Sequence, residues 1–439
     1  MNKNSLKVDI VVVGGGIAGL AAGALAASNN ASVLVLEAHQ LGGRARSVNR
    51  DGFIFNLGAH ALYQGGMAMQ ILHSLGIYPR GTPPPLKRYR ALIGQELHKM
   101  PTTPANLLTS TALGFRAKIR LVRALSSIDQ LSADQFFERS AGSWIANLGL
   151  PEEAESILRA ICRLSSYVGE LDEVSADVIV SQLQIGRRGV LYLHDGWRQL
   201  VEALSFLVPY RVGCGVEKLL PTRDHIEVHT QSQVFAAKAV IVATGIPSAT
   251  GLLLNNSSFT SSGSDVTAAC LGVGVSHVPE PGYVLDIDKP LYATTQLTQA
   301  NQSPTDRAVV EVVRYGARSA KLDRQALEAH LCFAGVNASD IVTSRFLPAM
   351  TVAGVLPTPS SGGLAGRRSV YESGIPGVFL AGDWIGPKGW LADAALASAQ
   401  EASNAALAWS AHQSLSRSIH LTAQKTTSDS TDGYPEESI

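Results

Sequence analysis

The chain has 439 residues, and its 36 Lys and Arg residues balance 36 Asp and Glu residues, so its formal net charge is zero. A balanced charge excludes the global electrostatic attraction on which most nucleic-acid-binding proteins depend, and we expect no nucleic-acid partner. Hydrophobic residues make up 46% of the chain and charged residues 16%. At this length, such a composition indicates two or three domains with large buried cores.

A glycine-rich turn follows the first apolar run. Val11–Val13 predict a buried parallel strand, and Gly14, Gly16 and Gly19 complete a G-x-G-x-x-G pattern. The first glycine permits a tight turn, the second lets a pyrophosphate approach the backbone, and the third lets a helix pack closely on the strand. A helix over Ile17–Ser28 would offer free amides and the positive end of its dipole to phosphates. The segment predicts a dinucleotide site.

An acid completes this pattern. The predicted strand Val33–Leu36 ends at Glu37, where a carboxylate accepts ribose hydroxyls and repels a 2′-phosphate.

Residues 10–27 also fit a membrane helix, and the first 26 residues resemble a signal peptide. Asp9, the run of glycines and Glu37 fit a strand and turn better. We therefore expect a soluble, cytoplasmic protein.

Later segments continue the same domain. Ile226–His229 and Val234–Phe235 predict hairpin strands, and Ala239–Gly245 predicts a buried strand. Gly377–Asp383 predicts a short strand that ends in a Gly-Asp turn, and Trp390–Trp409 an Ala- and Leu-rich helix. We expect one nucleotide-binding domain, discontinuous in sequence, built from residues 1–80, 190–250 and 350–410.

The two insertions are expected to form a second domain. Residues 81–189 contain helical patterns, whereas residues 251–349 mix strands with a helix near Asp323–Phe333. Together they predict an α+β substrate-binding domain.

Residues 411–439 are polar with little apolar periodicity, which predicts a disordered tail. The four cysteines, Cys162, Cys214, Cys270 and Cys332, form no C-x-x-C pair, so we expect reduced core thiols and no metal site.

Six motifs follow one another along the chain. They are Gly14–Gly19, Glu37, Leu41–Arg44, Phe55–His60, the strand pair within Val212–Ala243, and Gly382-Asp383 with the helix that follows. Together, and in this order, they resemble the flavin-dependent amine oxidase and phytoene desaturase superfamily, particularly its bacterial phytoene-dehydrogenase-like branch. The resemblance implies tightly but non-covalently bound FAD in an α/β fold of the glutathione-reductase (Rossmann) type.

The resemblance implies roles for individual cofactor-binding residues. Gly43 and Arg44 would lie along the pyrophosphate, where an arginine offers two donors; the alternative for Arg44 is an ordinary surface residue. Gly58 would pass close to the isoalloxazine, where a side chain would collide with the ring. The backbone of Val216 would pair with the adenine.

The C-terminal motif would contact the flavin itself. Asp383, after Gly382, would accept hydrogen bonds from ribityl or phosphate-adjacent hydroxyls, and the helix that begins near Trp390 would direct amides at flavin N1 and O2. This helix departs from the amine-oxidase pattern because it has Asp393 and Ser398 where that family commonly has glycine. We favour a structural role for Asp393 over one facing N1, where it would disfavour the reduced anionic flavin.

Three residues are candidates for the reaction centre. Trp390 aligns with one wall of the aromatic cage of amine oxidases, but Gly354–Gly363 offers no second aromatic wall, which weakens simple amine oxidation. Lys388 either reaches the flavin edge or is a solvated loop lysine, and the latter is favoured. His60 is either an acid, base or ligand anchor, or a hydrogen-bonded structural residue.

The leading functional interpretation is an oxidoreductase that takes a hydride from a small, largely apolar organic substrate to flavin N5, with oxygen or a quinone as acceptor. The alternatives are an amine oxidase, a redox-neutral flavin isomerase, and a non-enzymatic prenyl- or lipid-binding protein. Lys118, Arg120 and Arg123, within the expected helix Leu113–Leu125, would permit weak peripheral membrane contact, although a solvated face is the commoner arrangement.

Overall fold

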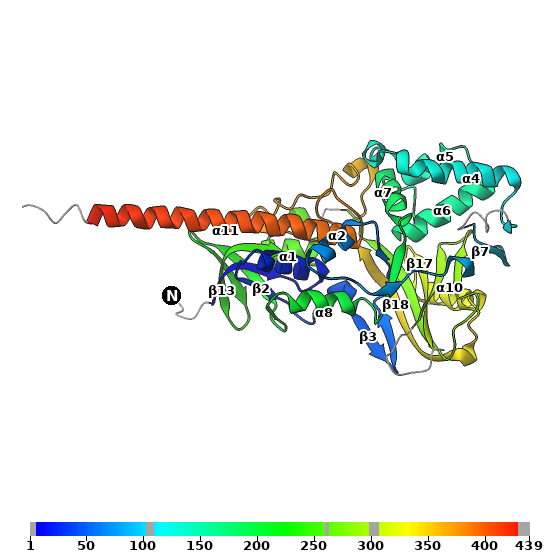
Figure 1. The fold of residues 1–439 in the computed structure, drawn as a ribbon, viewed down its shortest axis with the longest axis horizontal. Coiled ribbons are helices and arrows are strands. Elements are labelled where there is room, and N and C mark those ends of the chain that lie inside the picture. The colour runs from blue at the N-terminus through cyan, green and yellow to red at the C-terminus, as the bar shows by residue number, and fades with distance from the viewer. Residues whose placement is uncertain (1–5, 102–108, 260–262, 298–306, 429–439) are drawn as a thin grey trace, which may run out of the picture.

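A computed structural model describes residues 6–101, 109–259, 263–297 and 307–428, with side chains described as far as residue 414. Two sheets lie at opposite ends of an elongated body, and helix α11 (Ala392–Ser428) projects beyond the end that carries the first sheet (Figure 1). The cavity described below lies where segments of the two ends meet.

The first sheet has a parallel centre and an antiparallel edge. Strands β10, β2, β1, β13 and β19 run parallel, and β12 and β11 continue the sheet from β13 in antiparallel pairings. β1 and β2 end in fully buried apolar runs, as expected for parallel strands covered on both faces. In chain order the strands are β1 (Leu6–Val13), β2 (Val33–Leu36), β10 (Tyr210–Arg211), β11 (Val216–Pro221), β12 (Ile226–Thr230), β13 (Val234–Val242) and β19 (Val378–Leu380).

Helices from both ends of the chain cover this sheet. Helix α1 (Ile17–Ser28) packs against α8 (Arg198–Phe206) and against α11, which also contacts α2 (Met67–Ser74). Helix α9 (Pro247–Leu254) follows β13 and contacts β11. The sequence predicted two strands over 234–245, but β13 is one strand, because Ala236 and Ala237 pair with both β12 and β1.

The structure corrects the prediction of a disordered tail from residue 411. Helix α11 continues through Ser428, and residues 429–439 lie outside the described range. Between Ala392 and Ser428 the sequence has neither glycine nor proline, so nothing in its backbone chemistry ends the helix. Low apolar periodicity therefore did not exclude a helical backbone over residues 411–428.

The second sheet is built mainly from the two insertions. Its strand order is β18-β14-β17-β16-β15-β7-β8, and helix α10 (Ala320–Phe333) packs on β14, β16, β17 and β18. The strands are β7 (Tyr89–Ile93), β8 (Glu96–Lys99), β14 (Val266–Val275), β15 (Tyr283–Asp286), β16 (Leu291–Leu297), β17 (Ala308–Tyr315) and β18 (Ile341–Ala353). The strand and helix patterns predicted for the second insertion are thus present, and residues 350–353 extend β18 into this sheet.

A helical layer lies beside the second sheet (Figure 1). It consists of α4 (Phe115–Ser127), α5 (Ala141–Ala146), α6 (Glu152–Ser166) and α7 (Ala176–Gly186), which contact one another. Short strands connect the two ends of the molecule: the hairpin β3 (Ser47–Arg50) with β4 (Phe53–Asn56), and the group β5 (Leu62–Tyr63), β9 (Val190–Leu193) and β6 (Gly81–Thr82).

The four cysteines are free, but Cys332 is exposed rather than in a core.

Candidate functional site: a dinucleotide cavity

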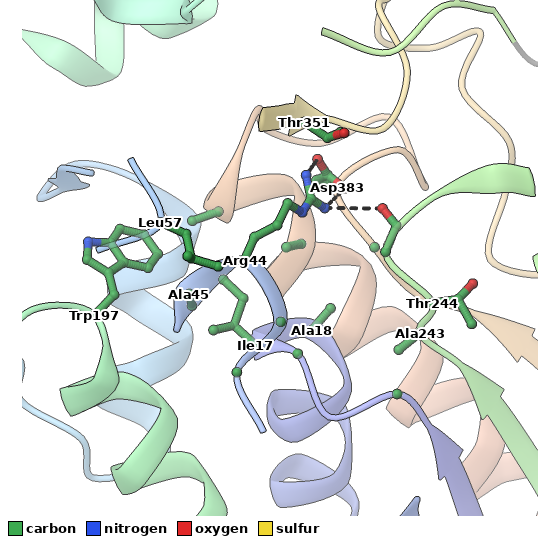
Figure 2. Close-up of a pocket in the computed structure, with 18 of the residues that line it drawn as sticks. Ile17, Ala18, Arg44, Ala45, Leu57, Trp197, Ala243, Thr244, Thr351 and Asp383 are labelled. Atoms are coloured by element: carbon green, nitrogen blue, oxygen red, sulfur yellow. Dashed lines mark hydrogen bonds and ion pairs between the residues drawn. The ribbon is translucent and has the colours of Figure 1, made fainter. Parts of the chain in front are cut away.

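A cavity of about 630 Å³ runs through the region where the two sheets approach each other. Figure 2 shows part of its wall, which brings together residues from α1, from the loop after β2, and from segments hundreds of residues further along the chain. Of the predicted cofactor-binding residues, the cavity is lined by Gly14, Gly16, Glu37, Gly43, Arg44, Val216, Gly382 and Asp383.

The glycine turn has the geometry that the motif predicts. Gly14 has a φ of +107°, and a Cβ there would lie 2.6 Å from the Ala243 carbonyl oxygen. A Cβ on Gly19 would lie 1.9 Å from the Gly14 carbonyl oxygen, so only glycine permits this helix–strand contact. In contrast, apart from its neighbours along the chain, no described residue has an atom within 4 Å of a Cβ built on Gly16. Open space at Gly16 leaves the backbone free for close approach by a ligand.

The start of α1 also fits an anion. Gly16 caps the helix without a side-chain hydrogen bond, and the first turn contains no acid. The first amides of a helix have no intrahelical partner and attract negative charge. Ile17 and Ala18 line the cavity at this point, so the helix presents its positive end to the space that a pyrophosphate would occupy.

Glu37 is held at the cavity by two backbone amides. One carboxylate oxygen accepts from Gly15 N at 2.7 Å, and the other accepts from His39 N at 2.8 Å. Each oxygen keeps a lone pair for a further donor such as a ribose hydroxyl. Val216, at a register shift in β11, and Gly215 line the same cavity.

Arg44 and Asp383 form a bidentate ion pair, with Nη2 2.6 Å and Nη1 2.8 Å from the two carboxylate oxygens (Figure 2). Nη1 also donates to the Val352 carbonyl at 3.0 Å, and Asp383 accepts from Gly354 N at 3.1 Å. The sequence assigned both side chains to the cofactor and did not anticipate that they bind each other. The pair ties the loop after β2 to the turn after β19.

Gly58 does not face the cavity, although Leu57 and Ala59 line it. Its φ is +103°, and a Cβ there would lie 2.3 Å from the Met350 sulfur. A left-handed backbone conformation and close packing against Met350 of β18 both favour glycine here. Clearance for the isoalloxazine stays a prediction.

His60 lines the cavity and is held by backbone carbonyls. Its Nδ1 donates to the Gly58 carbonyl at 2.6 Å, and its ring lies 5.0 Å from that of Trp197 between centroids. Burial lowers the pKa of the His60 imidazole below its ordinary value, which favours the neutral ring. This arrangement is that of a structural histidine, and a role in proton transfer stays a prediction.

Lys388 and Trp390 are not among the described residues that line the cavity. Lys388 is exposed on the loop before α11. Trp390 is buried in the core of the second domain, and its Nε1 donates to the Ser166 carbonyl at 2.9 Å. Its neighbour Leu391, with a φ of +55°, lines the cavity. A role for Trp390 as a wall beside the flavin stays a prediction.

Both departures in the C-terminal helix have structural explanations. Asp393 Oδ1 accepts from Ala68 N at 2.7 Å and so caps α2, whose N-cap residue Gly66 has no side chain to do so. Ser398 Oγ accepts from Gly382 N at 2.9 Å and donates to the Gly382 carbonyl. Asp393 also lines the cavity, and burial raises its pKa to about 6.

Three aromatic residues form part of the cavity wall: Tyr63, Tyr167 and Trp197. The Tyr63 hydroxyl donates to the Ser165 carbonyl and the Tyr167 hydroxyl to the Ala59 carbonyl, each at 2.8 Å. From the sequence, none of the three was assigned a role at the site. No spacing signal marks Tyr167, because it reaches the cavity from the end of α6.

The family model described as flavin containing amine oxidoreductase matches residues 17–269, more than half of the chain. The chain belongs to the flavin-containing amine oxidoreductase family. FAD is therefore its cofactor, and the open Gly16 backbone, the uncapped start of α1 and the anchored Glu37 are the features that fit the dinucleotide. The cavity contains no cysteine, which agrees with non-covalent binding by the described residues.

Individual similar proteins share either a segment of sequence or the fold with this chain. Protoporphyrinogen oxidase 2 of Arabidopsis thaliana is 28% identical over 152 residues, which are 31% of this chain and 30% of that protein. The match to this curated relative thus spans less than a third of its length. Two solved structures share the fold. A putrescine oxidase variant has a TM-score of 0.68 and 15% sequence identity, and the match covers 92% of this chain and 100% of that one. Cyclohexylamine oxidase from Brevibacterium oxydans has a TM-score of 0.65 and 16% identity, and the match covers 91% of this chain and 98% of that one.

Within the described ranges, no helix combines the length and apolarity that crossing a membrane requires. The same residues contain no grouping of His, Cys, Asp or Glu able to hold a metal ion.

Proposed function

We propose that this flavin-containing amine oxidoreductase takes a hydride from a small, largely apolar organic substrate, and that oxygen or a quinone reoxidises its flavin. The observation that carries the proposal is that the carboxylates lining the described cavity already have hydrogen-bond or ion-pair partners within the protein. Glu37 is bound by two backbone amides, Asp383 is paired with Arg44, and Asp393 caps α2. Each of the three carboxylates is thus already engaged, by backbone amides or by Arg44, rather than dedicated to an alkylammonium.

The rest of the wall supports an apolar substrate. Ala59, Leu391 and Met350 contribute apolar surface, and Tyr63 and Tyr167 use their hydroxyls on backbone carbonyls. Bound FAD supplies the hydride acceptor, whereas these side chains would exclude water and orient the C–H bond that is broken. The substrate loses a hydride and a proton, and the proton would leave through His60 or to solvent.

Amine oxidation is the second candidate, and the family description favours it. The aromatic pair Tyr63 and Tyr167 would guide a neutral amine without a carboxylate. The test is anaerobic mixing of the purified holoprotein with two panels, one of cyclic and polyene hydrocarbons and their alcohols, and one of primary amines. We expect loss of oxidised-flavin absorbance with members of the first panel.

Other results would replace the proposal. Reduction by amines alone would establish the second candidate. An altered product with an unchanged flavin spectrum would indicate a redox-neutral isomerase. Binding of apolar ligands with neither reduction nor product would indicate a carrier protein.

A further inference from the structure

Helix α4 presents an apolar stripe to solvent at the outer edge of the helical layer, far from the nucleotide-binding sheet (Figure 1). Phe115 is 78% exposed, and Ile119 and Val122 are each 39% exposed. These residues are spaced i, i+4 and i+7, so they share one face of the helix. Ala117 and Leu121, on another face, are buried and join the core of the second domain. The helix therefore has two apolar faces, of which the described parts of the chain cover one.

Cations border the exposed stripe on both sides. Arg116, Arg120 and Arg123 each follow a stripe residue by one position, a rotation of roughly 100° that places them along one flank. Lys118 precedes Ile119 and lies on the other flank. The helix contains no Asp or Glu, and the nearby Glu153 lies at Gly114, before the first turn. The protein as a whole is neutral, so this concentration of positive charge is local.

We propose that α4 docks the protein on an anionic lipid surface. An exposed phenylalanine with two branched aliphatic residues can enter the boundary between headgroups and acyl chains, while flanking cations contact lipid phosphates and carboxylates. Charge complementarity favours a lipid surface over a protein groove. Cations lie on both sides of the stripe, and an anionic membrane would present negative charge to both sides at once. The cavity takes no part in this contact, so the proposal is independent of the substrate.

The test is flotation of the FAD-loaded protein with vesicles of phosphatidylcholine, with and without phosphatidylserine. We expect binding to the mixed vesicles, weaker binding to pure phosphatidylcholine, and loss of binding at high salt, because screening removes the electrostatic part. Phe115→Ser should weaken binding about tenfold or more through the lost apolar area. Arg116→Gln with Arg123→Gln should weaken it by roughly 25-fold, at about fivefold per cation.

A matched control is Phe206→Ser, because Phe206 is 91% exposed but lies on α8 beside the first sheet. It should bind vesicles like the wild type. Flavin absorbance and melting temperature establish that each variant is folded, and the charge variant tests the proposal even if Phe115→Ser is unstable. Absence of binding to mixed vesicles, or equal binding by all variants, would overturn the proposal. So would a dimer in sedimentation experiments that Phe115→Ser dissociates, because the stripe would then bind a second copy.

Discussion

Arg44 and Asp383, separated by 339 positions in the sequence, form an ion pair in which two guanidinium nitrogens bind two carboxylate oxygens at 2.8 and 2.6 Å. The Asp383 side chain is 4% exposed, and that of Arg44 is 37% exposed. The pair therefore joins the first and last parts of the nucleotide-binding sheet at the wall of the cavity, and both side chains are positioned before FAD arrives.

Arg44→Ala should destabilise the apoprotein by about 2 kcal/mol. Removing one partner of a buried pair leaves an uncompensated charge, which costs about 3–5 kcal/mol when both are buried, and the partial exposure of Arg44 lowers this figure. Urea unfolding of the apoprotein measures it without a contribution from FAD. Arg324→Ala is the matched control, since Arg324 and Glu328 are half exposed and such pairs contribute less than about 1 kcal/mol. Equal effects of both substitutions would contradict a structural role for the Arg44 pair.

Glu37→Ala should weaken FAD binding by roughly tenfold to a hundredfold. Hydrogen bonds to a charged group contribute about 1.5–3 kcal/mol, and the substitution also releases the Gly15 and His39 amides. Calorimetric titration of the apoprotein with FAD measures the affinity. Glu202→Ala, an exposed acid on α8, should bind FAD normally. An unchanged affinity in the Glu37 variant would place the ribose elsewhere.

Asp393→Asn and Asp393→Ala should differ in stability. The amide oxygen of asparagine can still accept from Ala68 N, whereas alanine removes the cap of α2 and should cost about 1 kcal/mol. Thermal unfolding at pH 7 compares them. If Asp393 instead faces flavin N1, its charge would disfavour the reduced anionic flavin, and the asparagine variant should have a higher flavin reduction potential. A potential equal to that of the wild type would confine Asp393 to the structural role.

Glu311 should make the stability of the protein depend on pH. Its side chain is buried in the second sheet and accepts from Gln296 Nε2 at 3.2 Å, and burial raises its pKa from an ordinary value of 4.5 to about 8. Because the folded state holds this proton more tightly, the stabilisation is complete below about pH 4.5 and is lost as the pH rises towards 8.

Glu311→Gln keeps the shape of the protonated acid without the titration. Relative to the wild type, its free energy of unfolding should rise between pH 5 and pH 8, with a gain on the order of a few kcal/mol. Urea unfolding across this range measures the difference. Glu328→Gln, on the exposed face of α10, should show no comparable trend. A constant difference between wild type and Glu311→Gln would mean that Glu311 is already ionised at pH 5.

The sequence by itself determined the nucleotide-binding segment. The order of strand, glycine turn, helix, strand and Glu37 is local, and each step follows from backbone conformation or from the chemistry of a phosphate or ribose. Gly14 and Gly19 therefore lie where the motif predicts, with contacts that no side chain would permit. The family resemblance was likewise carried by short motifs, each of which is readable within a few residues.

Only the tertiary structure decided which distant residues share the cavity. Tyr167 reaches it from the end of α6, and Trp390 is buried beside Ser166 while its neighbour Leu391 lines the cavity. Arg44, after β2, meets Asp383, after β19, because β2, β1, β13 and β19 all run parallel, so the loops at their carboxyl ends lie at the same edge of the sheet. Side-chain direction and pairing between distant strands depend on packing across the whole chain, and no spacing along the sequence encodes them.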